Sequence, residues 1–307
     1  MSSKKEQHSD AARNMWETTN DDYEKFRPAH DEAGVRVLLE HLGLVDNVNH
    51  KNGTPPADDV IRNNGATPTY DVLEVGAGTG KCTRVIKDIL GENARIVVLD
   101  PVSGMLQQLK AMVPGVDVLV GFCESIPLPD NSVKAVVSSQ SFHFYANESA
   151  LREIHRVLIP GGKFGINFTA DDEDSPLIHE VLELIREYKY PECPDHFVNP
   201  LLDTSWKNCF DAAPLFTPLE EHLFPWENQQ TLPDAESVVK LFMTYSAIAR
   251  EPDVRKECAE RMLELLTTDP AIKQNGNPLE IPRMSALYCD LWSLVEASPL
   301  CSAAAVI

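Results

Sequence analysis

The chain has 307 residues, 43% of them hydrophobic, which is enough to bury a large core in one α/β domain with a helical elaboration. Its formal net charge is −20, so neither a nucleic acid nor an anionic membrane is expected as a partner. The seven cysteines form no Cys-x-x-Cys pair, so neither a disulfide framework nor a metal site is expected.

The N-terminal region is polar at its start and then helical. Its first eight residues lack the apolar core of a signal peptide, and no segment is apolar for long enough to span a membrane, so we expect a cytoplasmic protein. Helical patterns are predicted over residues 9–26, where Arg27-Pro28 ends the pattern, and over residues 33–44. Residues 46–69, rich in Asn, Asp, Gly and Pro, predict a long loop to which no function is assigned.

The most informative stretch is residues 70–80, YDVLEVGAGTG, in which an apolar run meets three glycines at alternate positions. It predicts a buried strand, a tight turn at Gly76, Gly78 and Gly80, and a helix over residues 81–90. Glycine is expected because the backbone must adopt angles that a Cβ resists, and because ligand atoms pass close to the main chain. The N–H groups at the helix start would face that ligand, so a site for an adenosine-containing compound is predicted.

Three features separate this turn from sites for dinucleotides and phosphates. Lys81 stands where a dinucleotide fingerprint has its third glycine, and the Gly-Lys-Ser/Thr ending of a phosphate loop is absent. Glu74 would repel a pyrophosphate and tolerate a cationic ligand. A second buried strand over residues 94–99 ends at Asp100, 20 residues after Gly80 (100 − 80), where a carboxylate would accept hydrogen bonds from both ribose hydroxyls.

The rest of the chain continues this alternation of strands and helices. Further strands are predicted at residues 116–120, 134–139, 163–168, 215–226 and 279–292. Further helices are predicted at residues 102–112, 147–158, 176–189, 204–213, 233–250 and 252–267. The acidic run 171–174 is expected to be a solvated loop rather than a metal site, because consecutive carboxylates cannot all face one ion.

Five motifs follow one another along this part of the chain: EVGAGTG at 74–80, LDPVSGML at 99–106, GFCESIPL at 121–128, SQSFH at 139–143 and EIHRVLIPGGK at 153–163. In this order they resemble the class I S-adenosylmethionine-dependent methyltransferases. The resemblance is strong over about residues 70–168 and extends, as an order of elements, over roughly residues 10–295. Within this family, the chain resembles a subgroup that acts on small molecules and includes ubiquinone-biosynthesis and trans-aconitate methyltransferases.

The resemblance implies an α/β fold with a Rossmann-like seven-stranded sheet, mostly parallel with the last strand antiparallel, flanked by helices and capped by helical elements over its C-terminal edge. It divides the chain into lid helices (1–45), a loop insertion (46–69), a cofactor-binding core (70–170), cap insertions with the last two strands (171–295) and a tail (296–307). It implies S-adenosyl-L-methionine as cofactor and in-line methyl transfer to a small-molecule acceptor, on oxygen, nitrogen, sulfur or a carboxylate, by a monomer or homodimer.

The resemblance also implies contacts to the cofactor. Tyr23 and Arg27 would belong to a lid over the pocket; the alternative is a helix that only packs on the domain, with Arg27 capping its own C-terminus. Met105 and Phe122 would sandwich the purine, but the acid usual at position 122 is missing, which leaves an amino-group contact by Glu124 open. The full set of implied cofactor residues is Tyr23, Arg27, Glu74, Gly76, Ala77, Gly78, Thr79, Gly80, Asp100, Pro101, Met105, Phe122, Cys123, Glu124 and Gln140.

On the acceptor side, Gln140 would contact the methionine part of the cofactor, and His143 lies near the reacting centre. A lone histidine most often forms a structural hydrogen bond, and a catalytic base is the alternative. No Asn/Asp-Pro-Pro-Tyr/Phe motif follows residue 139, which favours a small molecule over DNA or protein as acceptor. The predicted acceptor contacts are His143, Trp206, Trp226 and Tyr245, with Phe224 and Phe242 as further candidates; for each aromatic residue, core packing is the alternative.

Two other functions remain open at this point. A dinucleotide-dependent oxidoreductase is disfavoured by Lys81. A catalytically silent S-adenosylmethionine-binding scaffold or regulatory protein would keep the three glycines and Asp100, which indicate binding but say nothing about turnover.

Overall fold

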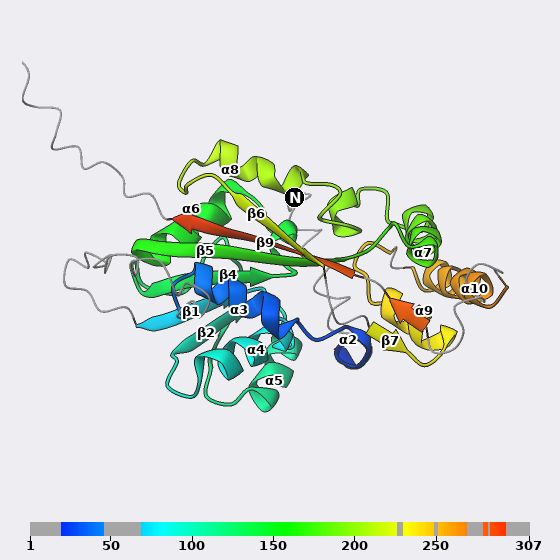
Figure 1. Cartoon of the computed structure of the whole chain (residues 1–307), viewed down its shortest axis with the longest axis horizontal. Helices are drawn as coiled ribbons and strands as arrows, with labels where there is room; N and C mark the ends of the chain where they lie inside the picture. Colours follow the sequence, from blue (N-terminus) through cyan, green and yellow to red (C-terminus); the bar gives the residue numbers. More distant parts are fainter. Residues whose placement is uncertain are drawn as a thin grey trace, which may run out of the picture.

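A computed structural model describes residues 20–45, 69–225, 230–248, 251–268, 279–281 and 283–292. Its centre is a sheet with helices on both faces, and further helices cover one end of the molecule (Figure 1). The strands of the sheet lie in the order β3 (Asp117–Val120), β2 (Ile96–Asp100), β1 (Tyr70–Val75), β4 (Val133–Ser139), β5 (Leu158–Asp171), β9 (Arg283–Trp292) and β6 (Glu220–Pro225).

The first five strands in this order run parallel to one another, whereas β9 pairs antiparallel with both β5 and β6. In the middle of the sheet, Val72 pairs with Ile96 on one side and with Ala135 on the other. The carboxyl ends of β1, β2 and β4 therefore reach the same edge, where open α/β sheets bind their ligands. The predicted Rossmann-like α/β fold is confirmed.

Successive residues of the central strands face opposite sides of the sheet. Val72 and Val98 pack with α3 (Glu32–His41), α4 (Lys81–Leu90) and α5 (Ser103–Met112), whereas Leu73 and Leu99 pack with α6 (Glu148–Val157) and α8 (Asn208–Ala212). Because both faces are covered, these strands are apolar on both sides, as their near-continuous Val/Leu/Ile runs indicate.

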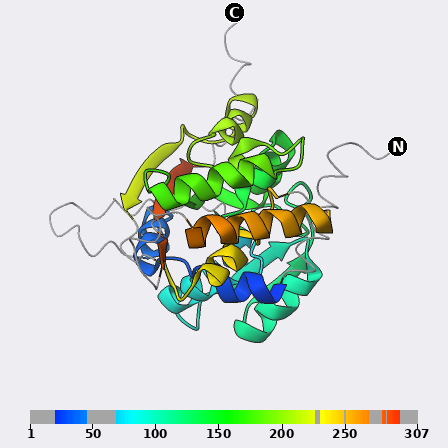
Figure 2. The same ribbon diagram turned by 90° about the vertical axis from the view of Figure 1, so that its right-hand side faces the viewer.

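The part of the chain after β5 builds a cap with its own apolar core. It consists of α7 (Pro176–Glu187), α9 (Ala235–Phe242), α10 (Pro252–Thr268) and the strand pair β7 (Gln230–Leu232) and β8 (Leu279–Ile281). Figure 2 shows α7 and α10 lying across this end of the molecule, with α2 (Asn20–Phe26) below them. Phe26 of α2 is buried in the cap cluster, so the N-terminal segment joins the cap to the core.

Several predicted elements differ from the observed ones, mostly in the cap. The helix predicted at 233–250 ends at Phe242, because the following residues form a turn in which Thr244 Oγ1 donates to the Leu241 carbonyl. The strand predicted at 279–292 is two strands, of which β8 pairs with β7 and β9 joins the main sheet. β7 itself was not predicted.

Other predictions fall partly or wholly outside the described residues. The helix predicted at 9–26 is described only from Asn20, as α2, and the helix predicted at 33–44 is α3, with Asp31 as its N-cap. Residues 46–68, Trp226 and the tail 296–307 lie outside the described residues. Among the residues described, no helix combines the length and the apolar character that crossing a bilayer requires.

Candidate active site

The turn after β1 follows a left-handed path that glycine adopts most easily. The φ angles of Gly76, Gly78 and Gly80 are 72°, 56° and 84°. A Cβ added to Gly76 would lie 2.4 Å from Ser141 Oγ, and one added to Gly80 would lie 2.7 Å from Leu109 Cγ. Backbone angle and close packing therefore both require glycine at the first and third positions.

Asp100 faces this turn from the end of β2. Its Oδ2 accepts a hydrogen bond from the Gly78 amide (2.9 Å), and its Oδ1 accepts one from the Val102 amide (2.8 Å). Burial raises the pKa of the carboxyl to about 6. Each oxygen keeps a further lone pair, so the carboxylate can also accept from the hydroxyls of a ribose.

The surroundings of Asp100 fit the adenosine part of S-adenosylmethionine. A Cβ on Gly78 would meet only Met105 Sδ within ordinary contact distance, 3.7 Å, so the main chain of the turn is approachable there. Met105 is itself buried beside the turn. Main chain, carboxylate and thioether thus meet at the edge where the ligand of this fold is expected.

Glu74 faces α4 rather than the glycine turn. Its Oε2 accepts a hydrogen bond of 2.6 Å from Thr83 Oγ1, and the residue is only 1% exposed. Burial raises the pKa of this carboxyl to about 8, so it is mostly uncharged at neutral pH. The predicted repulsion of a pyrophosphate needs a charge that this environment removes, and that argument is therefore wrong.

The N-terminal helix α2, called the lid here after its predicted role, is attached to the glycine turn through Glu24, which no sequence pattern singled out. Thr79 Oγ1 donates to Glu24 Oε2 (2.6 Å), and Arg84 Nη2 donates to Oε1 (2.8 Å). Lys81 Nζ donates to the Glu24 carbonyl (2.7 Å) and lies 3.6 Å from Oε1. No local pattern distinguishes Glu24 from the other acids of this acidic N-terminal region, because its partners lie on distant segments.

The end of the lid faces the cap. Arg27 Nε donates to Thr244 Oγ1 (2.8 Å), and its guanidinium lies 4.1 Å from the centroid of the Tyr245 ring and 5.7 Å from that of Tyr23. The Tyr245 hydroxyl in turn donates to Asp171 at the end of β5. Arg27 therefore links the lid to the cap, rather than only capping its own helix.

The loop after β4 is anchored to the end of β1. Ser141 Oγ and the Tyr145 hydroxyl each donate to the Val75 carbonyl at 2.9 Å. Gln140 has a φ of 56°, uncommon for a residue with a Cβ, and its Nε2 donates to the Thr169 carbonyl (2.9 Å). Phe142 is fully buried in the core, and the next residue, His143, lines a cavity on the other side.

This cavity, about 80 Å³ in volume, lies between the lid, the ends of β4 and β5, and the cap. It brings together five of the predicted site residues, namely Tyr23, Arg27, Gln140, His143 and Tyr245. Its other lining residues are Pro28, Ala29, His30, Lys81, Phe144, Thr169, Ala170, Asp171, Phe197, Val198, Pro200 and Ser246.

Two predicted acceptor contacts are core residues instead. The Trp206 ring packs against Phe142 and Phe168, and its Nε1 donates to the carbonyl of Pro200 (2.9 Å). Trp206 therefore supports the cavity wall from behind. Phe242 is fully buried in the cap core, while Trp226 and the side chain of Phe224 lie outside the described part of the chain.

The predicted adenine loop lies apart from the cavity residues. Phe122 is 42% exposed, and Cys123 is buried. Glu124 Oε1 accepts a hydrogen bond of 2.9 Å from Asn147, the N-cap of α6. The carboxylate of Glu124 is thus engaged with Asn147, and its contact with the adenine amino group stays a prediction, as do the roles of Ala77 and Pro101.

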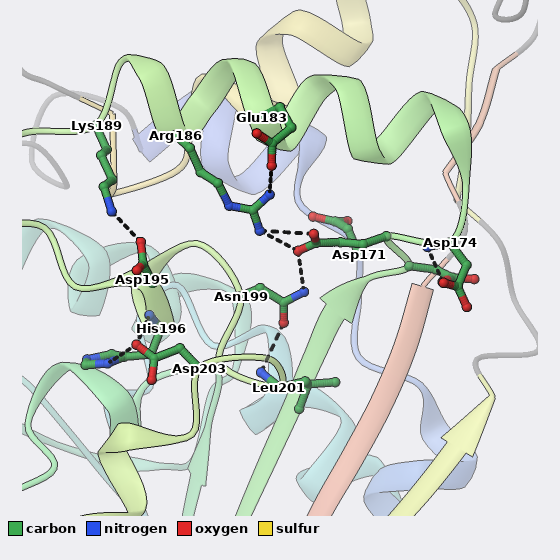
Figure 3. A network of polar contacts seen from close by, with 12 residues as sticks. Asp171, Asp174, Glu183, Arg186, Lys189, Asp195, His196, Asn199, Leu201 and Asp203 are labelled. Carbon is green, nitrogen blue, oxygen red and sulfur yellow. Dashed lines mark hydrogen bonds and ion pairs between the residues drawn. The ribbon is translucent and has the colours of Figure 1, made fainter.

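The acidic run 171–174 takes part in a polar network with α7 (Figure 3). Both carboxylate oxygens of Glu173 accept from Arg186 Nη2, at 2.8 and 3.0 Å, and Oε1 also accepts from Asn199 Nδ2 at 2.9 Å. Within the described ranges, no group of three or more His, Cys, Asp or Glu side chains is arranged to hold a metal ion. The network joins α7 to Asn199, whose neighbours Val198 and Pro200 line the cavity.

Comparison with known proteins identifies similar sequences and folds. A family described as methyltransferase domain matches residues 73–166. The chain is 33% identical over 214 residues to an uncharacterized methyltransferase-like protein of Schizosaccharomyces pombe, covering 69% of this chain and 78% of the relative. It is 32% identical over 212 residues to an uncharacterized methyltransferase of Mycobacterium bovis, covering 69% and 79%.

Among solved structures, a candidate type II methyltransferase from Anaeromyxobacter dehalogenans aligns with a TM-score of 0.54 and 20% identity, over 87% of this chain and 97% of that one. At this identity the likeness shows a common fold.

Proposed function

Because the chain belongs to the class I S-adenosylmethionine-dependent methyltransferases, we propose that it methylates a small molecule held in the cavity between lid, sheet edge and cap. The observation that carries this proposal is the composition of the cavity wall. Lys81 and Gln140 come from the cofactor side, whereas Phe197 and Tyr245 come from the cap. A compound bound there would touch both sides.

The cofactor, S-adenosyl-L-methionine, would be held by the glycine turn, Asp100 and Gln140. When bound, it supplies an electrophilic methyl group on a sulfonium. Asp100 would accept hydrogen bonds from the ribose hydroxyls, and Gln140 would lie beside the methionine part. The chain's main contribution is then alignment of the acceptor in line with the methyl group, which can lower a barrier by about 7–11 kcal/mol in favourable cases.

The acceptor side combines aromatic and polar groups. Phe144, Phe197 and Tyr245 offer ring surfaces, and Arg27 and His143 offer polar atoms. Such a wall suits a small compound with an apolar body and a few polar groups. The lid and the cap enclose the site, which favours a metabolite over a side chain of a folded protein.

The proposal is tested by incubating the protein with S-adenosylmethionine labelled in its methyl group and a metabolite extract, with Asp100→Ala as a control. We expect label in one or a few small molecules, and its loss in Asp100→Ala. Label found only in protein or nucleic acid would contradict the small-molecule proposal. Tight binding of S-adenosylhomocysteine without any transfer would favour a catalytically silent scaffold.

A further inference from the structure

His30 lies between α2 and α3 and lines the cavity, although no sequence pattern singled it out. It directly precedes Asp31, the N-cap of α3, whose carboxylate accepts from the Ala33 and Gly34 amides at 3.3 and 3.1 Å. Three residues before it, Arg27 joins the lid to the cap. The backbone is therefore fixed on both sides of His30.

The ring of His30 is held by the ends of two neighbouring strands. Its Nδ1 lies 3.2 Å from Ser139 Oγ of β4 and 3.5 Å from Asn167 Nδ2 of β5. Because a hydroxyl and an amide N–H face Nδ1, we assign Nδ1 as the acceptor, which places the ring proton on Nε2. Among the described residues Nε2 has no hydrogen-bond partner, and it is not one of the side-chain atoms that the fold encloses without one. His30 therefore offers an N–H donor to a ligand.

This donor does not depend on the charge of the imidazole. Burial, with the charges of Lys81 and Arg84, lowers the pKa of His30 to about 4, so the ring is neutral at pH 7. A neutral imidazole that accepts at one nitrogen donates at the other.

Lys81 supplies a second donor to the same cavity. Its Nζ donates to the Glu24 carbonyl (2.7 Å) and lies 3.6 Å from Glu24 Oε1, and an ammonium has three protons, so one remains for a ligand. The Glu24 carboxylate also pairs with Arg84, so one negative charge faces two positive charges. Only 10% of the Lys81 side chain is exposed, which limits screening of its charge by solvent. An N–H donor and a shielded positive charge suit a carboxylate.

Both donors belong to the segments that the proposed function gives to the cofactor. His30 rests on the residue before Gln140, and Lys81 directly follows Gly80 of the glycine turn. Arg27, the other permanent cation of the cavity wall, is tied to the cap instead. The adenosine part of the cofactor is uncharged, whereas its methionine end carries a carboxylate.

We propose that His30 and Lys81 bind the carboxylate at the methionine end of S-adenosylmethionine. This inference rests on the proposed function. Nε2–H of His30 and the ammonium of Lys81 each donate to the carboxylate, while Asp100 accepts from the ribose at the other end. The cofactor is thus held on both sides of its sulfonium, and adenosyl thioethers without the carboxylate are bound less tightly.

Three ligands separate the carboxylate from the rest of the cofactor in calorimetry. S-adenosylhomocysteine is complete, its decarboxylated analogue keeps only the amine, and 5′-methylthioadenosine lacks the whole amino-acid part. We expect the wild-type protein to bind S-adenosylhomocysteine about 10- to 100-fold more tightly than the decarboxylated analogue, as for the loss of a charge-assisted hydrogen bond.

Substitution of His30 tests the donor itself. His30→Phe keeps a ring but removes the N–H, so S-adenosylhomocysteine should bind about 10-fold more weakly, while the affinities for the other two ligands change by less than a factor of about 2. His30→Gln, whose amide can donate, should recover most of the loss. Lys81→Met should also weaken S-adenosylhomocysteine more than the decarboxylated analogue. His179→Phe, on the exposed side of α7, is the matched control and should change none of the three affinities.

The wild-type comparison needs no variant, and equal affinities for S-adenosylhomocysteine and the decarboxylated analogue would overturn the inference. It is also overturned if His30→Phe weakens all three ligands equally, which would assign His30 a structural role, or if it weakens none. Wild-type protein that binds neither S-adenosylhomocysteine nor 5′-methylthioadenosine would instead refute the proposed function.

Discussion

The turn predicted to hold the cofactor is made chiefly of main chain, whereas the cavity beside it is lined by side chains from distant segments. On the cofactor side, a turn of three left-handed glycines lies against Asp100, which is held by two backbone amides. On the acceptor side, Arg27 reaches Thr244 across 217 residues of sequence, and Tyr245 reaches Asp171 across 74.

The two regions should tolerate amino-acid substitutions to different degrees. A backbone turn with positive φ angles accepts few substitutions, so the cofactor side has little freedom to change. Side chains of the cap can be exchanged without disturbing that turn, because the cap has a separate apolar core. We therefore expect substitutions in the cap to change the acceptor more readily than the cofactor. Four substitutions, with expected effects of decreasing size, test this difference.

Gly76→Ala should be the most damaging change to the cofactor side. A left-handed φ costs a residue with a Cβ about 1–2 kcal/mol, and overpacking adds about 1–3 kcal/mol, here against Ser141. We expect a loss of about 2–5 kcal/mol in the free energy of unfolding, measured with urea. Gly43→Ala is the matched control, with a φ of 71° and no atom within 4 Å of the added Cβ. Equal losses in both variants would contradict the close packing at Gly76.

Asp100→Asn should weaken binding of S-adenosylhomocysteine by about 10- to 100-fold, because a hydrogen bond to a charged group contributes about 1.5–3 kcal/mol. The wild-type affinity should also fall as the pH drops below about 6, where Asp100 takes up a proton, and this dependence should be lost in the variant. Calorimetry measures both. Asp88→Asn, exposed on α4, is the control, and an unchanged affinity in Asp100→Asn would exclude the ribose contact.

Glu24→Gln tests whether the lid belongs to the cofactor side. The change keeps the shape but removes the charge that accepts from Thr79 and Arg84. We expect S-adenosylhomocysteine to bind up to about 10-fold more weakly, equivalent to about 1 kcal/mol of lost charge-assisted hydrogen bonding. Glu32→Gln removes the exposed Glu32–Arg36 pair of α3 and should change the affinity by less than a factor of about 2. Similar effects of both substitutions would show that the lid does not depend on Glu24.

Glu74→Gln should have the smallest effect, visible in its pH dependence. The carboxyl has a pKa of about 8 in the folded chain against 4.5 in the unfolded one, so the folded state binds more protons between these values. Wild-type stability from this group therefore falls as the pH rises through that window, and the loss is complete above the folded pKa. Relative to Glu74→Gln, wild type should lose about 1 kcal/mol between about pH 7 and pH 9. A constant difference in the free energy of unfolding would contradict an uncharged Glu74.

The core of this protein follows from local sequence patterns. The apolar runs, the alternate glycines and the distance to Asp100 are local patterns, and each dictates backbone geometry within one strand, turn or helix. They predicted the parallel strands of the sheet and the left-handed turn. Candidate residues that follow from their own place in a local pattern, such as Gly76 and Asp100, could be found in this way, whereas Gln140 was implied only by the family resemblance.

Which side chains meet in the cavity depends on how distant segments of the chain pack together. Glu24 carries no local signature, because its partners Thr79 and Arg84 depend on how α2 packs on the sheet edge. For the same reason, the sequence does not tell whether an aromatic residue after β5 lines the cavity, as Tyr245 does, or fills the core, as Trp206 does. Local periodicity indicates that a side chain is buried. The neighbours against which it packs are determined by how distant segments come together.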